Sequence, residues 1–142
     1  MGERHNLYQH DVMKIKSKKI EKPISCYVYL STNGDLRTAE YKEKKQRRYI
    51  MDYAKAHNIK ISKIMHRGVL GVHSANKQFD MIVKSISEKE VDGVLIANMG
   101  SISTSIADAY NKVAKVISAG GQIITVDEGN LILNIKKLGG IA

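Results

Sequence analysis

The side chain best placed for nucleophilic chemistry is that of Ser31, which follows a segment typical of a buried strand. Residues 24–30 are dominated by β-branched and aromatic side chains, as strands covered on both faces require. Residues 31–35 favour a turn, because Asn33-Gly34 takes positive φ at little cost. Ligands and reactive groups collect at the carboxyl edge of an open α/β sheet. We therefore expect the Ser31 hydroxyl at such an edge.

Histidine and carboxylate side chains are weaker candidates for chemistry. His66 and His73 flank a glycine-punctuated segment, 66–76, which we predict to be a loop. No third ligand lies near them in the sequence, so we expect no metal site. Asp127 and Glu128 follow a predicted strand and could transfer protons, although a hydrophilic turn is the more ordinary role for such a pair.

Several familiar site patterns are absent from the sequence. It contains no G-x-x-x-x-G-K-[ST] loop, no G-x-G-x-x-G after a strand and no G-x-S-x-G elbow,. The lone cysteine, Cys26, excludes an internal disulfide and a cysteine-based zinc site,. Its place in the middle of a strand favours a small buried hydrophobe. We accordingly expect neither a cofactor nor a metal.

Length and composition are those of one globular domain. At 142 residues, with 43% apolar and 26% charged side chains, the chain can bury a core without disulfides or metal,. No apolar run approaches the roughly 18 residues of a membrane span, and no signal-peptide block opens the chain. A cytoplasmic location without membrane contact is the default expectation.

The formal net charge of +9 is the unusual bulk property. Such a protein attracts polyanions, DNA and other nucleic acids first among them, although a merely solvated surface explains the charge as well. Residues 1–22 carry six Lys/Arg against three Asp/Glu. We interpret them as a basic mobile leader. The seven Tyr are scattered and do not form a base-stacking platform,.

Hydrophobic periodicity divides the rest of the chain into alternating strands and helices. Helices are predicted at 36–57, around Phe79–Ile86 and at 106–117, with Asn58 and Gly120 or Gly121 ending the first and third,. Strands are predicted at 59–65, 94–97 and 122–126, with a possible short one at 131–135 after a turn at 127–130. Ser103 or Thr104 is the expected N-cap of the third helix.

This order predicts an α/β fold. We expect a three-layer sandwich around a mostly parallel sheet of four to five strands, occupying residues 23–142. Right-handed crossovers would place Ser31, His66 and Asn98 at one edge of that sheet.

Ordered motifs across residues 24–130 carry a family resemblance. Tyr27-Val28-Tyr29-Leu30-Ser31-Thr32 resembles the Tyr-x-Arg-x-Ser-Thr opening of the serine recombinases, the family of resolvases, invertases and large transposon recombinases. The remaining matches are similar in order and spacing: Gln46 before Tyr53-Ala54, Gly68-Val69-Leu70-Gly71, Phe79, Val91-Asp92-Gly93-Val94-Leu95-Ile96 and Glu128. The resemblance implies a resolvase-like fold.

The resemblance also implies a DNA-cleaving mechanism, with Ser31 in the nucleophile's place. In that family the serine attacks a phosphodiester and becomes joined to the 5′ phosphate, while arginines hold the phosphate. The chemistry needs those cations because a hydroxyl is a weak nucleophile and the phosphodiester is anionic.

This sequence departs from the family pattern at those arginines. Tyr29, Asn76, Ser101 and Thr104 stand where the resemblance expects arginine, Gly100 replaces an aspartate and Leu70 replaces a loop serine. Losing one preorganised charge-stabilising group typically lowers the rate by about 10²–10³. The resemblance implies a long dimerisation helix and a separate DNA-binding domain, and we expect neither within these 142 residues.

We therefore predict a resolvase-like domain without strand-cleavage activity, serving as a binding or regulatory module. DNA and another recombinase-like subunit or second copy are the expected partners. The basic side chains that could contact phosphate are Arg37, Lys44, Arg47, Arg48 and Arg67. Two alternatives remain open: a divergent active recombinase working through Ser31, and a small-molecule-binding α/β domain using the same edge of the sheet.

Overall fold

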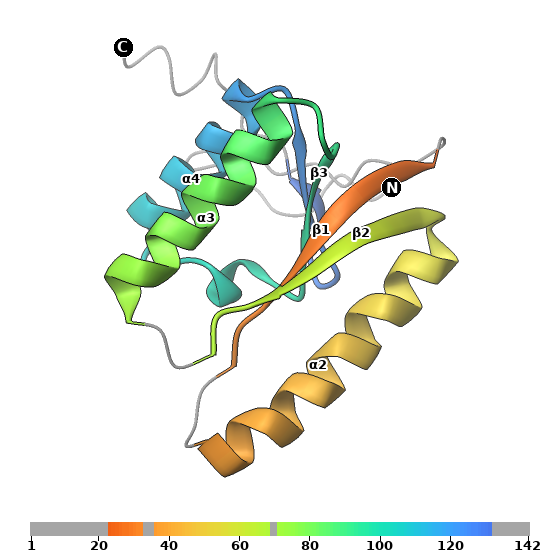
Figure 1. The fold of residues 1–142 in the computed structure, drawn as a ribbon, viewed down its shortest axis with the longest axis vertical. Coiled ribbons are helices and arrows are strands. Elements are labelled where there is room, and N and C mark those ends of the chain that lie inside the picture. Colours follow the sequence, from red (N-terminus) through yellow and green to blue (C-terminus); the bar gives the residue numbers. More distant parts are fainter. Residues whose placement is uncertain (1–22, 33–35, 69–70, 132–142) are drawn as a thin grey trace, which may run out of the picture.

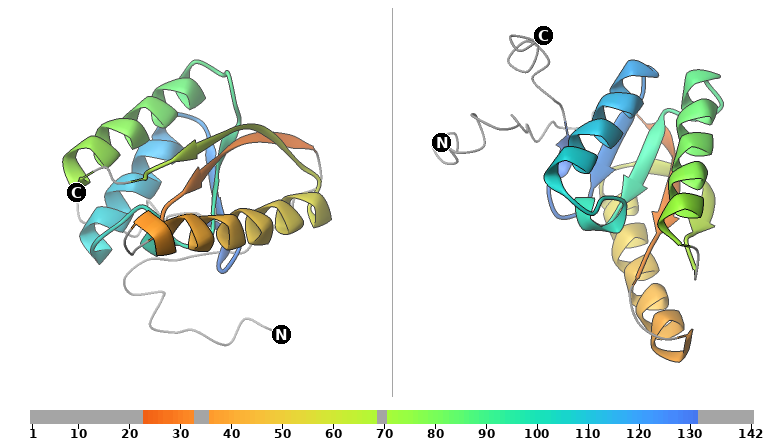
Figure 2. Two further views of the ribbon diagram at one scale, coloured as in Figure 1. Left: turned by 60° about the horizontal axis from the view of Figure 1, so that its bottom comes forward. Right: turned by 90° about the vertical axis from the view of Figure 1, so that its left-hand side faces the viewer.

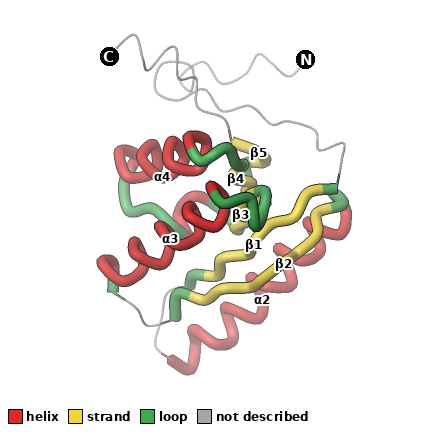
Figure 3. The backbone as a smooth tube through the Cα atoms, turned by 45° about the horizontal axis from the view of Figure 1, so that its top comes forward, coloured by secondary structure: helices red, strands yellow, loops and turns green. Residues whose placement is uncertain are grey.

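The computed structural model describes residues 23–32, 36–68 and 71–131. In these residues five strands form one sheet in the order β2-β1-β3-β4-β5; Figure 1 labels β1, β2 and β3, and Figure 3 labels all five. Strands β1 (Ile24–Leu30), β2 (Ile59–His66), β3 (Gly93–Ile96) and β4 (Gln122–Thr125) are parallel. The short β5 (Gly129–Leu131) runs antiparallel to β4.

Helices cover both faces of the sheet. Helix α2 (Leu36–Ala56) lies on one face, and α3 (Val72–Ser87) and α4 (Ile106–Ser118) lie on the other (Figures 2 and 3). The predicted three-layer α/β sandwich is confirmed. Strand β1 supplies both cores, since side chains alternate across a strand: Val28 and Leu30 pack with the α2 side, and Tyr29 packs with Phe79 on the α3–α4 side.

The first helix ends close to the predicted place. Its last helical residue is Ala56, and Asn58 has a φ of 58°, the left-handed conformation that closes helices,. Strand β2 then pairs with β1 through a register shift opposite Cys26 and Tyr27, which leaves Ser62 as an extra residue in β2. Such a bulge increases the local twist of an edge strand.

Two predicted boundaries around the later helices are wrong. The loop predicted at 66–76 ends at Gly71, and α3 already begins at Val72 because the Gly71 carbonyl accepts the Ala75 N–H at 2.9 Å. The N-cap of α4 is Ser105, whose hydroxyl accepts the Asp108 N–H at 3.1 Å. A short 3₁₀ turn, η1 (Met99–Ser101), forms part of the connection between β3 and α4.

The turn after β4 is also shorter than predicted. Gly129 adopts a φ of 82° and starts β5, in which Asn130 pairs with Ile124. The predicted strand at 131–135 is therefore wrong in its start, and its residues beyond Leu131 lie outside the described residues. So do the predicted leader at 1–22, the turn residues 33–35 and Leu70.

Within the described ranges, no helix combines the length and the apolar character that crossing a membrane requires.

Gly93 allows β3 to lie close to the main chain of β4. A Cβ atom on Gly93 would overlap the main chain of Gln122 in β4. We expect Gly93→Ala to force β3 and β4 apart and to lower the free energy of unfolding by at least about 2 kcal/mol, as overpacking does. Chemical denaturation measures it. Gly71→Ala is the control, because nothing lies within 4 Å of its added Cβ. Equal effects of the two changes would contradict this account of the β3–β4 contact.

Candidate functional site

Ser31 lies at the carboxyl edge of the sheet, directly after β1, as predicted. Its main chain is tied to α2: the Ser31 N–H donates to Gln46 Oε1 at 2.8 Å, and Gln46 Nε2 donates to the Ser31 carbonyl at 3.0 Å. Among the described residues, the Ser31 hydroxyl makes no hydrogen bond. Gln46, singled out by its place in the family pattern, therefore positions the turn that carries Ser31.

The other two edge residues lie where the topology predicts. His66 pairs with Leu30 in the ladder, and Asn98 follows the parallel strand β3, so both lie at the same edge as Ser31. His66 Nδ1 lies 2.9 Å from Glu43 Oε1. His73 lies in the first turn of α3, exposed. No cluster of three metal-ligating side chains occurs among the residues described.

The positions at which the resemblance leads us to expect arginine meet at one cavity. The cavity has a volume of about 270 Å³ and lies between β1, α3, η1 and α4. The described positions that the sequence analysis singled out as departing from the family pattern all line it: Tyr29, Asn76, Gly100, Ser101 and Thr104. Ser31 is not among the described residues that line this cavity.

The remaining lining is partly apolar and partly charged. Val72, Ala75 and Phe79 of α3 form an apolar wall with Ile102. The charged lining consists, in the described part of the chain, of Arg67, Asp108 and Lys112.

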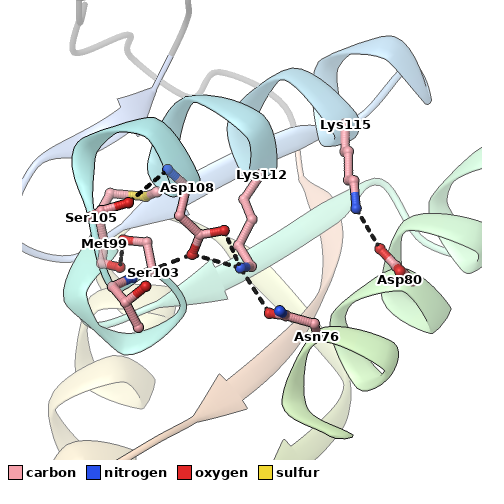
Figure 4. A network of polar contacts seen from close by, with 9 residues as sticks. Asn76, Asp80, Met99, Ser103, Ser105, Asp108, Lys112 and Lys115 are labelled. Carbon is pink, nitrogen blue, oxygen red and sulfur yellow. Dashed lines mark hydrogen bonds and ion pairs between the residues drawn. The ribbon is translucent and has the colours of Figure 1, made fainter. Parts of the chain in front are cut away.

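Lys112 is a buried cation held by Asp108 of its own helix and by Asn76 of α3 (Figure 4). Its ammonium donates to both carboxylate oxygens of Asp108, at 2.9 and 2.8 Å, and to Asn76 Oδ1 at 2.9 Å. The ammonium also lies 5.8 Å from the centre of the Phe79 ring, within reach of a cation–π attraction. Asp108 therefore balances the charge of Lys112 locally, and the pair ties α4 to α3.

Tyr29 carries a polar atom that the fold leaves unpaired. Its side chain is 2% exposed, and its buried hydroxyl has no hydrogen-bond partner among the described residues. Burial raises the pKa of Tyr29, and the positive charge of Arg67 offsets part of that rise. A buried hydroxyl without a partner is unfavourable, so this atom needs an explanation.

The carboxylate of Asp127 joins the turn after β4 to neighbouring elements. The Tyr49 hydroxyl of α2 donates to Asp127, and Asn98 Nδ2 donates to the second Asp127 oxygen at 3.1 Å. The hydrogen bond to Asp127 raises the pKa of Tyr49. The Glu128 N–H donates to Thr125 Oγ1 at 2.7 Å. Asp127 thus holds the edge together, in agreement with the prediction of a hydrophilic turn.

Cys26 is fully buried in β1. Burial, with a smaller contribution from Asp92, raises the pKa of its thiol to about 12. Because the thiolate is the reactive form, this residue is a packing residue, as predicted.

The basic residues proposed for phosphate contact lie at two places. Arg37, Lys44, Arg47 and Arg48 are exposed on α2, and Arg67 is half-buried after β2, with its N–H bonded to Leu30 at 2.9 Å. At about 100° per residue, Arg37, Lys44, Arg48 and Lys55 share one line on α2, opposite the buried Ile50. We call these four residues the α2 basic stripe. Arg47 lies to one side of it.

Sequence reasoning missed the pair Asp108 and Lys112. The signal was available, because Lys112 falls on the apolar face of α4, between Ala109 and Val113, and Asp108 precedes it by four residues,. A lysine on a buried face needs a counter-charge.

We expect the Asp108–Lys112 pair to contribute strongly to stability. Asp108→Asn leaves a buried ammonium without its counter-ion, which should lower the free energy of unfolding by about 3 kcal/mol. Adding Lys112→Met should recover part of that loss. The matched control is Asp80→Asn, which breaks the exposed ion pair between Asp80 and Lys115 (2.9 Å) and should change stability by less than about 1 kcal/mol. Equal losses in the two single variants, measured by urea denaturation, would contradict the burial argument.

Similarity to known proteins was found in structure but not in sequence. No protein-family model and no curated protein sequence matches the chain. A resolvase-family site-specific recombinase from Streptococcus pneumoniae superposes with a TM-score of 0.65 at 18% identity, over 83% of this chain and 85% of that one. The C-terminal catalytic domain of ISC1926 TnpA, an IS607-like serine recombinase, gives 0.56 at 18% identity, over 72% and 67% of the two chains. The chain therefore has the fold of serine recombinase catalytic domains.

Proposed function

We propose that this chain is a resolvase-like domain that does not cleave DNA strands and acts as a DNA-associated binding or regulatory module. The observation that carries the proposal is the composition of the cavity formed by the substituted positions. Tyr29, Asn76, Ser101 and Thr104 bring hydroxyl and amide groups there instead of four guanidinium groups.

Among the described residues, the two cations that line the cavity are poor substitutes for four arginines. Lys112 is already engaged by Asp108 and Asn76. Arg67 is a single guanidinium, and stabilising a phosphoryl transition state takes several fixed positive charges. The Ser31 main chain is bonded to α2, whereas the cavity is lined from the α3–α4 side. These features favour a structural role for Ser31 in the turn over a role as nucleophile.

Helix α2 supports the proposed association with DNA. Its 21 residues include seven Lys/Arg and three Asp/Glu. The α2 basic stripe extends over about 27 Å at 1.5 Å per residue. A line of exposed cations of that length can contact several phosphates of a duplex without reading its sequence.

The proposal predicts that no covalent DNA adduct forms. We expect wild-type protein and Ser31→Ala to behave alike when incubated with nicked suicide duplexes of mixed sequence and resolved on denaturing gels, because cations are missing around the scissile phosphate. A DNA-linked band that is present in wild type and lost in Ser31→Ala would overturn the proposal in favour of a divergent active recombinase.

DNA association should depend on salt and on α2. We expect Lys44→Gln combined with Arg48→Gln to weaken binding to a labelled duplex and to reduce the slope of log K against log[salt] by about 2, since each lost phosphate contact removes about 0.9. Fluorescence anisotropy over a KCl series measures both quantities.

The matched control removes the same charge from another surface. Lys77→Gln combined with Lys84→Gln changes two exposed positions of α3, on the opposite face of the sheet. This double variant should keep the wild-type slope. If both double variants lost DNA affinity equally, the interaction would depend on net charge and not on α2. If the affinity did not change with salt concentration, contact with phosphates would be excluded.

A further inference from the structure

Two tyrosine side chains are exposed on the basic helix α2. Tyr41 is 62% exposed and Tyr49 is 48% exposed. The sequence predicted no base-stacking platform, because its tyrosines are scattered along the chain. Helical geometry nevertheless brings these two to one side of α2, about 80° apart around the helix axis and about 12 Å apart along it. Their rings are therefore available to a flat partner that lies along the helix.

Cations lie on the same side of α2 as these rings. At about 100° per residue, Tyr41 lies beside the α2 basic stripe, and the exposed Lys45 lies between Tyr41 and Tyr49,. The Lys45 ammonium is 5.1 Å from the centre of the Tyr41 ring, within reach of a cation–π attraction. A ligand that covers both rings must therefore carry negative charge next to flat groups.

The carboxylates near Tyr49 determine where the charges of such a ligand lie. The Tyr49 hydroxyl donates to Asp127, and Asp52 is exposed on α2 three residues after Tyr49. These carboxylates repel a phosphate placed beside them, since like charges raise the energy. An uncharged ring is not repelled. The Tyr49 ring therefore favours a base, and the phosphates are better placed along the α2 basic stripe.

A single DNA strand combines these chemical features. Its bases offer their ring faces to aromatic side chains, whereas in a duplex the same faces are stacked on neighbouring base pairs. Stacking on tyrosine also tolerates every base. At about 3.4 Å per nucleotide, the distance between the two tyrosines corresponds to three or four nucleotides, and the α2 basic stripe to about eight.

We infer that α2 binds single-stranded DNA in preference to duplex DNA, with bases stacked on Tyr41 and Tyr49 and phosphates along the α2 basic stripe. This inference rests on the proposed association with DNA and specifies the form of DNA that is bound. The stripe supplies attraction to any polyanion. The two rings supply the preference for an unpaired strand.

Comparison of a single strand with a duplex tests the inference. The probes are a labelled oligothymidylate of about 12 nucleotides and a labelled duplex of the same length, both measured by fluorescence anisotropy with the full chain at about 150 mM KCl. We expect the single strand to bind wild type at least about fivefold more tightly than the duplex. Tyr41→Leu and Tyr49→Leu should each weaken single-strand binding by at least about fivefold and leave duplex binding unchanged. The two losses should multiply in the double variant, because the positions are about 12 Å apart.

Conservative variants separate the rings from their hydroxyl groups. Tyr41→Phe and Tyr49→Phe keep a ring that can stack, and the second also removes the donor to Asp127. Both should bind oligothymidylate within about twofold of wild type. Leucine keeps helix propensity, and circular dichroism checks that the leucine variants remain folded. Met81→Ala is the control for an exposed apolar side chain on α3, across the sheet from α2, and should bind as wild type does.

Tyrosine emission reports stacking directly. The chain contains no Trp, so its ultraviolet emission comes from tyrosine. Saturating oligothymidylate should quench part of this emission in wild type. In the double variant Tyr41→Leu with Tyr49→Leu, a saturating strand should leave the remaining emission unchanged, because the two stacking rings are gone.

The outcomes separate this inference from the proposed function. If duplex binding depends on Lys44 and Arg48 while the leucine variants bind oligothymidylate as wild type does, the proposed function holds and this inference is overturned. Tighter binding of the duplex than of the single strand also overturns it. So does an equal loss of single-strand affinity in the phenylalanine and leucine variants. If neither form of DNA binds, the proposed function and this inference fail together.

Discussion

Alternation along β1 is the constraint on which the rest of the structure depends. This strand pairs with β2 on one side and with β3 on the other, and it is covered by helices on both faces. Each residue of β1 must therefore belong to one of two cores. Leu30 is committed to the α2 side and Tyr29 to the α3–α4 side, which brings Tyr29 to the cavity. The turn carrying Ser31 is then fastened to α2 by Gln46.

The fold could be predicted from the sequence because buried side chains recur with the period of a helix or of a strand. Apolar runs such as Val94-Leu95-Ile96 predict central parallel strands, and Phe79, Ile82 and Ile86 mark the buried face of α3,. The wrong predictions for the starts of α3 and α4 lie where local hydrogen bonds determine the first residue of a helix. Gly71 precedes the first residue of α3 and its carbonyl accepts the Ala75 N–H, and Ser105 caps α4 because its hydroxyl accepts the Asp108 N–H. Neither choice leaves a periodic signal.

The candidate site was only partly predictable. The positions at which the resemblance predicts arginine could be named from the motifs, but their convergence on one cavity depends on how α3 and α4 pack. The engagement of Lys112 by Asn76 joins residues 36 positions apart and has no local signature. The unpaired state of the Tyr29 hydroxyl is a property of packing alone, so only coordinates could reveal it.

The exposed edge of β2 has a consequence for self-association. Within the described residues the eight-residue β2 pairs with a strand on one side only, and such an edge strand can act as a template for another strand. Here Lys60 and Lys63 are exposed along it, and the bulge at Ser62 interrupts its regular pairing geometry. Both devices discourage strand-to-strand addition. The sheet is therefore poorly suited to being extended from one copy to the next at β2.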